Sequence, residues 1–188
     1  MENLAFDYNF EEFEDEPDYE LIGGEKVYMS ATAPNISHGI IVMRLGSMFT
    51  NYIDENNIDA FVLADNADVH LSPENHYRPD VSVVLRKPNI KNVEKFIAGA
   101  PDLVVEVLSE STKDNDTGIK KDAYEKYGVK EYWIVSPEDR SIKIYHNVDG
   151  KFQFRGEYKL HNSKTKIKVS IFDNLIIDIR KVFKWWLE

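Results

Sequence analysis

Two stretches of the chain carry apolar residues at helical spacing. In residues 37–57, SHGIIVMRLGSMFTNYIDENN, apolar side chains recur mostly three and four positions apart, which predicts an amphipathic helix ending at a polar Asn-Asn pair. Residues 112–129, TKDNDTGIKKDAYEKYGV, predict a second helix, with Asp116 or Thr117 as its N-cap and Gly128 as its C-terminal stop. Strand-like sequence lies between the two helices and after the second.

Shorter runs rich in β-branched and aromatic residues predict strands, at residues 60–73, 78–85, 101–109 and 130–137. Two hairpins are also predicted, one turning at the Gly-Gly of YELIGGEKVYMS and one at the Asp-Gly of SIKIYHNVDGKFQF. The chain then closes with a strand or two and a short helix. This order predicts an α/β (α+β) fold, with a central mixed β-sheet flanked by helices and an added C-terminal hairpin.

Length and composition fit one folded domain. The chain has 188 residues, of which 43% are hydrophobic, and we expect a single domain over residues 19–188. Residues 1–18 form an acidic lead-in, a kind of charge block that usually stays in solvent. Residues 1–20 hold nine acids and no Lys or Arg, so the remainder carries only −1 of the net charge of −10. Because the rest of the chain is nearly neutral, it can still form the basic cleft that phosphate binding requires.

The absence of cysteine limits the chemistry that the chain can perform. Disulfides and thiolate metal sites are excluded, so any metal would be held by oxygen or imidazole ligands, which favours hard divalent cations. No run approaches the roughly 18 apolar residues of a membrane span, and the N-terminus lacks the basic and apolar regions of a signal peptide. We therefore expect a cytoplasmic protein that does not enter a membrane.

Two of the predicted strands carry a carboxylate. Asp80 begins one strand, and Glu106 lies among valines in the other, on the same strand face as Val104 and Leu108. If the strands are neighbours, the two carboxylates converge at one end of the sheet, where they repel unless a cation lies between them. Mg²⁺ or Mn²⁺ is the usual solution. The alternative is that each acid caps a loop or pairs with a nearby arginine such as Arg78.

A lysine in the second helix is a further candidate for this site. Lys120 shares a helix face with Ala123, Tyr124 and Tyr127, so it is directed toward the sheet. A lysine there can reach back to the end of the Glu106 strand, although it can equally extend along the helix edge into solvent. The neighbouring Lys121 is expected in solvent.

Four histidines show no spacing that is typical of metal ligands: His70, His76, His146 and His161.

The motifs RPDVSVV, PDLVVEVLSEST, DTGIKKDAY and YGVKEYWIVSPEDRSIKIY, with YELIGGEKVYMS and SHGIIVMRL upstream, occur in this order along the chain. In order and spacing, from around Tyr19 to the final segment, they resemble the Uma-two family of restriction-type endonucleases, a branch of the PD-(D/E)xK nuclease superfamily. The resemblance implies a restriction-endonuclease-like core and a nuclease that hydrolyses DNA phosphodiester bonds with Mg²⁺ or Mn²⁺.

The resemblance also implies roles for individual residues. Asp80 and Glu106 match the two metal-binding acids, with the backbone carbonyl of Val107 as a further ligand. The superfamily usually has a lysine two residues after the second acid, where this chain has Leu108. The corresponding role matches Lys120 in the following helix, with Lys121 as the fallback.

Two more residues match auxiliary positions of the family. Glu20 is either a ligand close to the metal site or a strand-edge residue in solvent. His38 either contacts a phosphate or a water at the metal site, or makes only local hydrogen bonds at a helix N-terminus. The resemblance further implies DNA as the partner and a homodimer, because cutting both strands commonly needs two sites. The leading alternative is a nuclease-fold module that binds or assembles without cutting, and a second alternative is a purely structural ion-pair network.

Overall fold

The computed structural model describes residues 19–28, 35–64, 67–86 and 96–184, and the predicted acidic lead-in, residues 1–18, lies outside them. The helices are α1 (Ile36–Glu55), α2 (Lys113–Thr117), α3 (Ile119–Tyr127) and α4 (Ile179–Val182). The strands are β1 (Tyr19–Ile22), β2 (Glu25–Tyr28), β3 (Ala60–Ala64), β4 (Val69–Ser72), β5 (Asn75–Tyr77), β6 (Val81–Leu85), β7 (Ile97–Ala98), β8 (Leu103–Val107), β9 (Glu131–Ser136), β10 (Ser141–Val148), β11 (Lys151–Lys159), β12 (Lys166–Lys168) and β13 (Ile176–Asp178).

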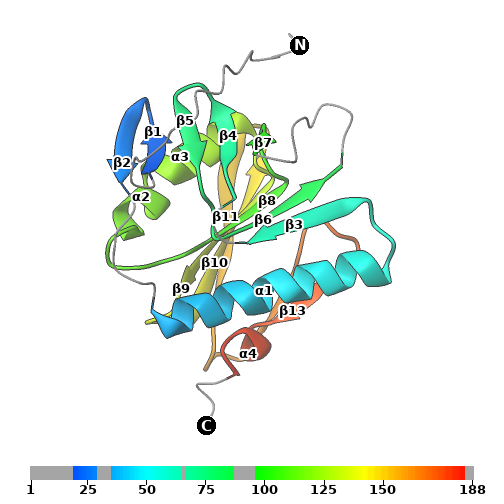
Figure 1. Cartoon of the computed structure of the whole chain (residues 1–188). Helices are drawn as coiled ribbons and strands as arrows, with labels where there is room; N and C mark the ends of the chain where they lie inside the picture. Colours follow the sequence, from blue (N-terminus) through cyan, green and yellow to red (C-terminus); the bar gives the residue numbers. More distant parts are fainter. Residues whose placement is uncertain (1–18, 29–34, 65–66, 87–95, 185–188) are drawn as a thin grey trace.

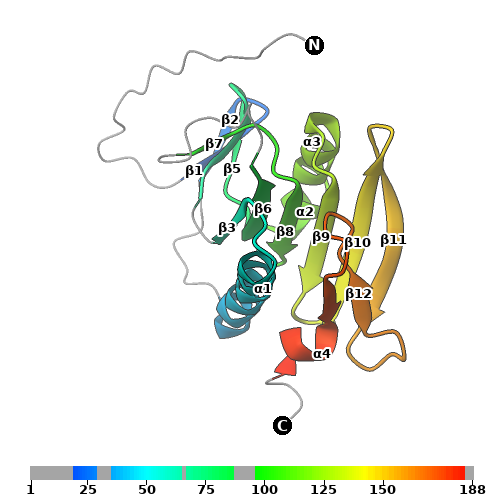
Figure 2. The same ribbon diagram turned by 90° about the vertical axis from the view of Figure 1, so that its right-hand side faces the viewer.

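A six-stranded mixed sheet with the order β11-β10-β9-β8-β6-β3 forms the centre of the fold. Strands β8 and β9 pair in parallel, through the connection that contains α2 and α3, and the other neighbours are antiparallel. A smaller sheet with the order β2-β1-β5-β4-β7 lies beside it, and β12 and β13 form a separate pair. Figure 2 shows the β10–β11 hairpin at one edge of the central sheet and the smaller sheet toward the other.

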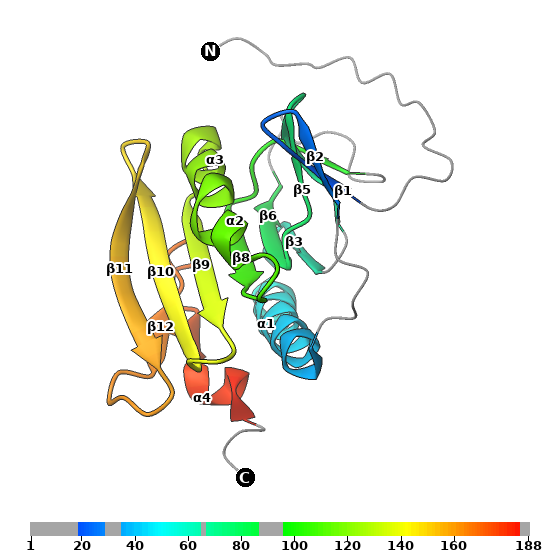
Figure 3. The same ribbon diagram turned by 90° about the vertical axis from the view of Figure 1, so that its left-hand side faces the viewer.

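The central sheet separates two hydrophobic cores. On one face, α1, the β12–β13 pair and α4 cover residues such as Val105 and Trp133. On the other face, α3 and the smaller sheet cover Val104 and Tyr132. Successive residues of β8 and β9 thus enter different cores, as the alternation of side chains along a strand requires. Figures 1 and 3 show the sheet between α1 on one side and α3 on the other.

The structure confirms the predicted mixed sheet flanked by helices, both hairpins and the long helix. Asn35 caps α1 with its side chain, which accepts a hydrogen bond from the Ser37 amide at 3.2 Å. Asp149 and Gly150 both have positive φ, as a two-residue hairpin turn needs. Gly128 ends α3 in the left-handed conformation that favours glycine. No helix among the described residues is long and apolar enough to cross a membrane.

Two sequence predictions are wrong in detail. Residues 60–73 form two strands rather than one, because β3 pairs with β6 in the central sheet and β4 joins the smaller sheet. The second helix is broken at Gly118, so neither Asp116 nor Thr117 caps α3. A Cβ atom at Gly118 would lie 2.9 Å from the carbonyl oxygen of Asp114, so the tight turn between the two short helices requires glycine.

The pairing of β6 with β8 brings the two strand carboxylates together. Val81 is the antiparallel partner of Val105, which places Asp80 opposite Glu106. Side chains of opposed residues lie on the same side of a sheet. The condition set by the sequence, that the two strands are neighbours, is therefore met.

Phe49 of α1 is fully buried and packs edge-on against Trp133 of the central sheet, with ring centroids 5.8 Å apart. We predict that Phe49→Ala lowers the free energy of unfolding by about 3–5 kcal/mol, because it opens a cavity between α1 and the sheet. Urea denaturation measures the change. Met43 of the same helix is 68% exposed, and Met43→Ala should change stability by less than about 0.5 kcal/mol. Similar losses from both variants would contradict this packing.

Candidate active site

The ammonium group of Lys120 lies among three carboxylates, at the start of α3 and on its sheet-facing side. Its Nζ is 2.9 Å from Glu106 Oε1, 3.1 Å from Glu20 Oε1 and 3.2 Å from Asp116 Oδ1. Lys120 is only 3% exposed, and Glu106 and Asp116 are each 2% exposed. Lys120 is thus directed toward the sheet, as its helix face predicts, and it does not extend into solvent.

Glu106 is fixed by partners from different parts of the chain. Its Oε1 accepts a hydrogen bond from the Tyr124 hydroxyl at 2.8 Å in addition to the contact with Lys120. Its Oε2 accepts only a long bond of 3.4 Å, from the backbone amide of Asp80. Tyr124 follows Lys120 by one helical turn, so a single helix face provides both side chains that bind Oε1. The other oxygen is directed toward Asp80 and is less fully engaged.

Asp80 immediately precedes the first residue of β6 and lies beside the first turn of α1. Its Oδ2 accepts a hydrogen bond from the backbone amide of Val107 at 2.6 Å, and its Oδ1 lies 3.1 Å from His38 Nε2. In a β-strand the N–H and C=O of one residue point to the same side. The carbonyl of Val107 therefore also points to the side of Asp80. His38 thus contacts an acid of the candidate site rather than making only local hydrogen bonds.

Glu20 reaches the same cluster from β1 of the first hairpin. It is 7% exposed, and its Oε1 accepts a hydrogen bond from the Arg78 amide at 2.7 Å as well as contacting Lys120. The alternative of a strand-edge residue in solvent is therefore wrong for Glu20. The guanidinium of Arg78 binds Asp68 at 2.7 Å, so it does not take up the pairing with Asp80 that the sequence left open.

Asp116 belongs to this cluster although the sequence analysis treated it only as a possible helix cap. It lies in α2, and the Tyr132 hydroxyl fixes its backbone by donating to its carbonyl at 2.8 Å. Asp116 and Lys120 are four residues apart, a spacing at which opposite charges often pair. That four-residue spacing is the signal available in the sequence. Asp116 is instead predicted as a possible N-cap of one continuous helix, because the break at Gly118 is not anticipated.

Lys121, the fallback candidate, does not join the cluster. It is half-buried rather than in solvent, and its Nζ lies 4.4 Å from the centre of the Tyr145 ring. Leu108, two residues after Glu106, packs against the core beneath α3. Lys120 is therefore the lysine that the fold brings to Glu106.

Carboxylates outnumber cations in this buried cluster. Burial raises the pKa of the Glu106 carboxyl well above its usual range, against the opposing effect of Lys120. The nearby acids raise it further, in the order Asp116, Asp80 and Glu20. Burial likewise raises the pKa of Asp116. For Lys120, burial alone would lower the pKa, but the surrounding carboxylates raise it well above its usual value. An additional positive charge would therefore be stabilised here.

The oxygen ligands available here suit a divalent cation that keeps several bound waters, rather than a cation held entirely by protein ligands. Within the described ranges, no group of three or more His, Asp or Glu side chains is arranged to hold a metal ion. Asp80 and Glu106 do supply two adjacent carboxylates, and the Val107 carbonyl points to the same side. Mg²⁺ is typically bound by one or two carboxylates and keeps several waters.

Comparison with known proteins decides the family. The chain matches the model of the Uma2 family, described as "Putative restriction endonuclease", over residues 5–178. The chain belongs to the Uma2 family. The family expected from the sequence motifs is thus confirmed, and membership supports a restriction-endonuclease-like nuclease.

Two relatives extend the comparison of this Uma2 protein. An uncharacterized protein of Synechocystis sp. is 32% identical over 135 residues, which cover 70% of this chain and 67% of that protein. A crystal structure from Anabaena variabilis, described as a "putative nuclease belonging to DUF820", matches with a TM-score of 0.71 and 20% identity. The match covers 92% of this chain and 93% of that one. At this identity the likeness concerns the fold, and it agrees with the predicted fold class.

We predict that Lys120→Met destabilises the protein strongly and in a pH-dependent way, because three buried carboxylates lose their cation. The loss should be about 3–5 kcal/mol near pH 8. Carboxyl groups whose pKa is raised by folding bind protons more tightly in the folded state, so they favour folding at low pH and this contribution is lost as pH rises. The loss should therefore shrink as the pH is lowered toward about 5.

Urea denaturation across this pH range measures the effect, with Lys121→Met as the matched control. Lys121 lies next in the chain and carries the same charge, but it contacts the Tyr145 ring instead of the carboxylates. The control should be only mildly destabilised, with no recovery at low pH. Equal, pH-independent losses in both variants would contradict the charge imbalance inferred for the cluster.

Proposed function

We propose that this Uma2 protein is a metal-dependent nuclease that hydrolyses DNA phosphodiester bonds. The observation that carries the proposal is the position of Lys120, whose Nζ lies 2.9 Å from Glu106, with Asp80 directly opposite Glu106 across the sheet. Two strand acids and one lysine are the residue types on which PD-(D/E)xK nucleases depend. Here the lysine comes from α3 instead of the strand.

In this proposal Asp80, Glu106 and the Val107 carbonyl hold Mg²⁺ or Mn²⁺. The cation supplies Lewis-acid polarisation of the phosphodiester and lowers the pKa of water. Among the described residues, Glu106 Oε2 accepts only the long bond from the Asp80 amide, and Asp80 Oδ1 is contacted only by His38, so each carboxylate has an oxygen that could also bind a cation. The Val107 amide fixes the rotamer of Asp80 through its bond of 2.6 Å, so the donor atoms are held before substrate arrives.

Lys120 acts in this scheme mainly by holding Glu106 in place. It is too deeply buried to be a surface contact for DNA, and its charge favours the ionised form of Glu106. The same charge acts on the negative charge that develops on the phosphate during hydrolysis. His38 is more accessible, with a side chain that is 15% exposed, and we assign it to orienting Asp80 and contacting a substrate phosphate. Glu20 and Asp116 position the ammonium group.

A nuclease-fold module that does not cut is the second candidate, and the substitution of Leu108 for the usual lysine favours it. A purely structural network is less well supported. Such networks are stable when the charges within them are balanced, whereas here three carboxylates share one ammonium group. The excess of negative charge is the property expected of a site that binds a cation.

The substrate, the assembly and the location are further parts of the proposal. DNA is proposed because the family is described in terms of restriction endonucleases. A homodimer is proposed because cleavage of both strands needs two sites. A cytoplasmic location is the third part of the proposal.

We predict that Asp80→Asn and Glu106→Gln each weaken Mn²⁺ binding at least about tenfold and lower DNA cleavage at least about 10²-fold, while the protein stays folded. Each variant keeps one oxygen, which can still accept from the Val107 amide in Asp80→Asn and from Tyr124 and Lys120 in Glu106→Gln, and each removes one negative charge from a cluster with an excess of carboxylates. Calorimetry measures binding, and cleavage of a mixture of plasmid, linear duplex and single-stranded DNA measures activity.

Glu131→Gln is the matched control, because Glu131 is an equally buried glutamate whose carboxylate binds Trp133 and Ser170 away from the cluster. It should bind Mn²⁺ like the unmodified protein. Binding that is lost in both site variants, without cleavage of any DNA by the unmodified protein, would favour the non-cutting module. Equal binding by all the proteins would contradict the proposed metal site itself.

A further inference from the structure

One face of the β1–β2 hairpin carries two aromatic rings and a cation. Tyr19 is the antiparallel partner of Tyr28, and Leu21 is the partner of Lys26. Residues two apart on one strand and their partners on the other share a face, so these four side chains form one surface, which we call the hairpin face. The only charge among the four is that of Lys26. In a chain with a net charge of −10, this surface does not repel a phosphate backbone.

The two rings of the hairpin face form an aromatic surface that is open to solvent. They meet at 65°, with their centroids 6.0 Å apart, which is an edge-to-face contact. Lys26 Nζ lies 4.5 Å from the centre of the Tyr19 ring. Tyr28 is 55% exposed, so its ring is the one that a ligand can reach. An exposed ring beside a second ring and a cation is the combination found on surfaces that bind single-stranded nucleic acids.

The hairpin face is one strand away from the Lys120 cluster. Tyr19 directly precedes Glu20, and alternation along β1 turns Glu20 to the inner face of the hairpin, where it contacts Lys120 at 3.1 Å. Val27 is the partner of Glu20, and it packs on the same inner side against the core under α3. Only the thickness of the hairpin therefore separates a ligand on the hairpin face from the candidate active site.

The two rings also lie at the end of the hairpin that leads toward the metal-binding acids. Both are at its open end, where β1 begins and β2 ends. Tyr28 is seven residues before Asn35, the N-cap of α1, so the two lie at most about 25 Å apart. The first turn of α1 holds His38 at 3.1 Å from Asp80. A short connection thus joins the aromatic pair to the helix that contacts the site.

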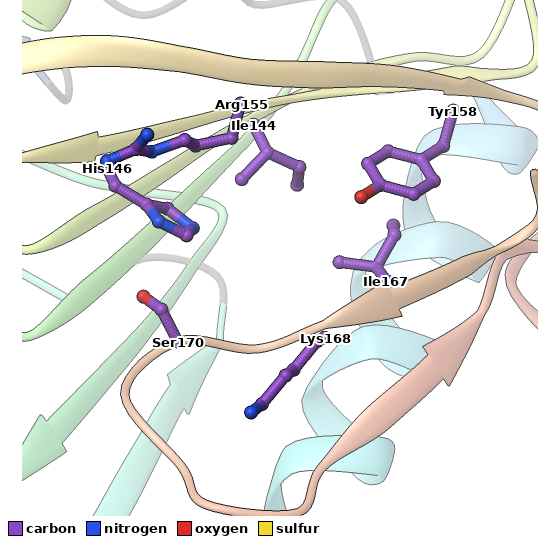
Figure 4. Close-up of a pocket in the computed structure, with 7 residues that line it drawn as sticks. All are labelled: Ile144, His146, Arg155, Tyr158, Ile167, Lys168 and Ser170. Carbon is purple, nitrogen blue, oxygen red and sulfur yellow. The ribbon is translucent and has the colours of Figure 1, made fainter.

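The hollow between the β10–β11 hairpin and β12 does not provide a comparable surface for DNA. It has a volume of about 370 Å³, and Arg155 and Tyr158 are among its lining residues (Figure 4). The ammonium group of Lys168 points away from Arg155, so no two cations converge there on one phosphate. The buried carboxylate of Glu131, which binds Ser170, lies behind the hollow. An anionic ligand is therefore disfavoured in it.

We propose that the hairpin face binds an unpaired base of the DNA substrate, stacked on the ring of Tyr28, beside the phosphodiester that the nuclease site cuts. This rests on the proposed nuclease function and adds a substrate class to it. Lys26 contributes positive charge next to the base, where the phosphate backbone passes. Every base has a π-face, so the contact selects unpaired bases without selecting a sequence. Bases inside a duplex are already stacked and must be extruded to reach Tyr28, so single-stranded DNA is preferred.

Fluorescence anisotropy with short labelled DNA of equal length tests this substrate class. The three ligands are oligothymidine, an abasic strand with the same number of phosphates, and a duplex. All are measured in Ca²⁺, which has the oxygen-ligand preference of Mg²⁺ and keeps a divalent cation available to the carboxylates. The unmodified protein should bind oligothymidine at least about fivefold more tightly than the abasic strand or the duplex, because only oligothymidine offers free bases.

Substitutions on the hairpin face separate stacking from charge. Tyr28→Thr should remove the preference for oligothymidine, because threonine keeps the strand propensity but offers no ring, whereas Tyr28→Phe should keep it. Both variants should bind Mn²⁺ like the unmodified protein, since Glu20 rather than Tyr28 reaches the cluster, and this shows that the hairpin stays in place. Lys26→Gln should weaken the binding of oligothymidine and the abasic strand alike, because it removes a charge and not a stacking partner.

Phe154→Thr is the matched control. Phe154 is 56% exposed, and its ring lies 5.5 Å from that of Tyr145, so it resembles Tyr28 in exposure and in having an aromatic neighbour. It belongs to β11, the edge strand of the central sheet, away from the carboxylates. This variant should bind all three ligands as the unmodified protein does.

The anisotropy readout does not depend on cleavage, so it separates this proposal from the nuclease proposal. A base preference that Tyr28→Thr removes would support the hairpin face even if no DNA is cut. If the unmodified protein cuts DNA but Tyr28→Thr keeps the base preference, the hairpin face is overturned and the nuclease proposal stands. Equal affinity of the unmodified protein for oligothymidine and the abasic strand, or no saturable binding of either, would also overturn the hairpin face.

Discussion

The burial of one ammonium group among three carboxylates is the interaction on which the site depends. Lys120 contacts Glu20, Glu106 and Asp116, which come from β1, β8 and α2. Charges taken out of water are costly unless they are paired with good geometry, so these elements can pack tightly only with the lysine in place. The same contacts leave the cluster with an excess of negative charge. One arrangement therefore ties the hairpin, the central sheet and the broken helix together, and its excess of negative charge would favour a bound cation.

The fold supplies the geometry through strand pairing and alternation. The antiparallel register of β6 and β8 puts Asp80 opposite Glu106, and alternation along β8 turns Glu106 toward α3 while its neighbours enter the core under α1. The parallel step from β8 to β9 requires a crossover connection, and α2 and α3 provide it. Lys120 thus lies in the connection that the parallel pairing of β8 and β9 requires.

Sequence alone predicted much of this arrangement, and the reasons differ by residue. Asp80 and Glu106 were predictable because a carboxylate inside a β-branched run is unusual, and Lys120 because helical spacing placed it with buried tyrosines. Asp116 was missed, since the sharp turn at Gly118 depends on a close backbone approach that no periodicity reveals. The burial of Glu20 depends on long-range contacts with Arg78 and Lys120, and the position of Lys121 over Tyr145 depends on the neighbouring strand.

A bound cation would supply the positive charge that this cluster lacks, and proton release on Mn²⁺ binding is the most direct test of this claim. Titration calorimetry at neutral pH, in buffers that differ in ionisation enthalpy, measures the number of protons released. Because burial raises the pKa of Glu106, its carboxyl binds a proton more tightly than an ordinary glutamate does, and a cation bound there competes with that proton, so we predict that Mn²⁺ binding releases protons. Glu106→Gln should abolish this release. Binding without proton release, or equal release from Glu106→Gln, would contradict the claim.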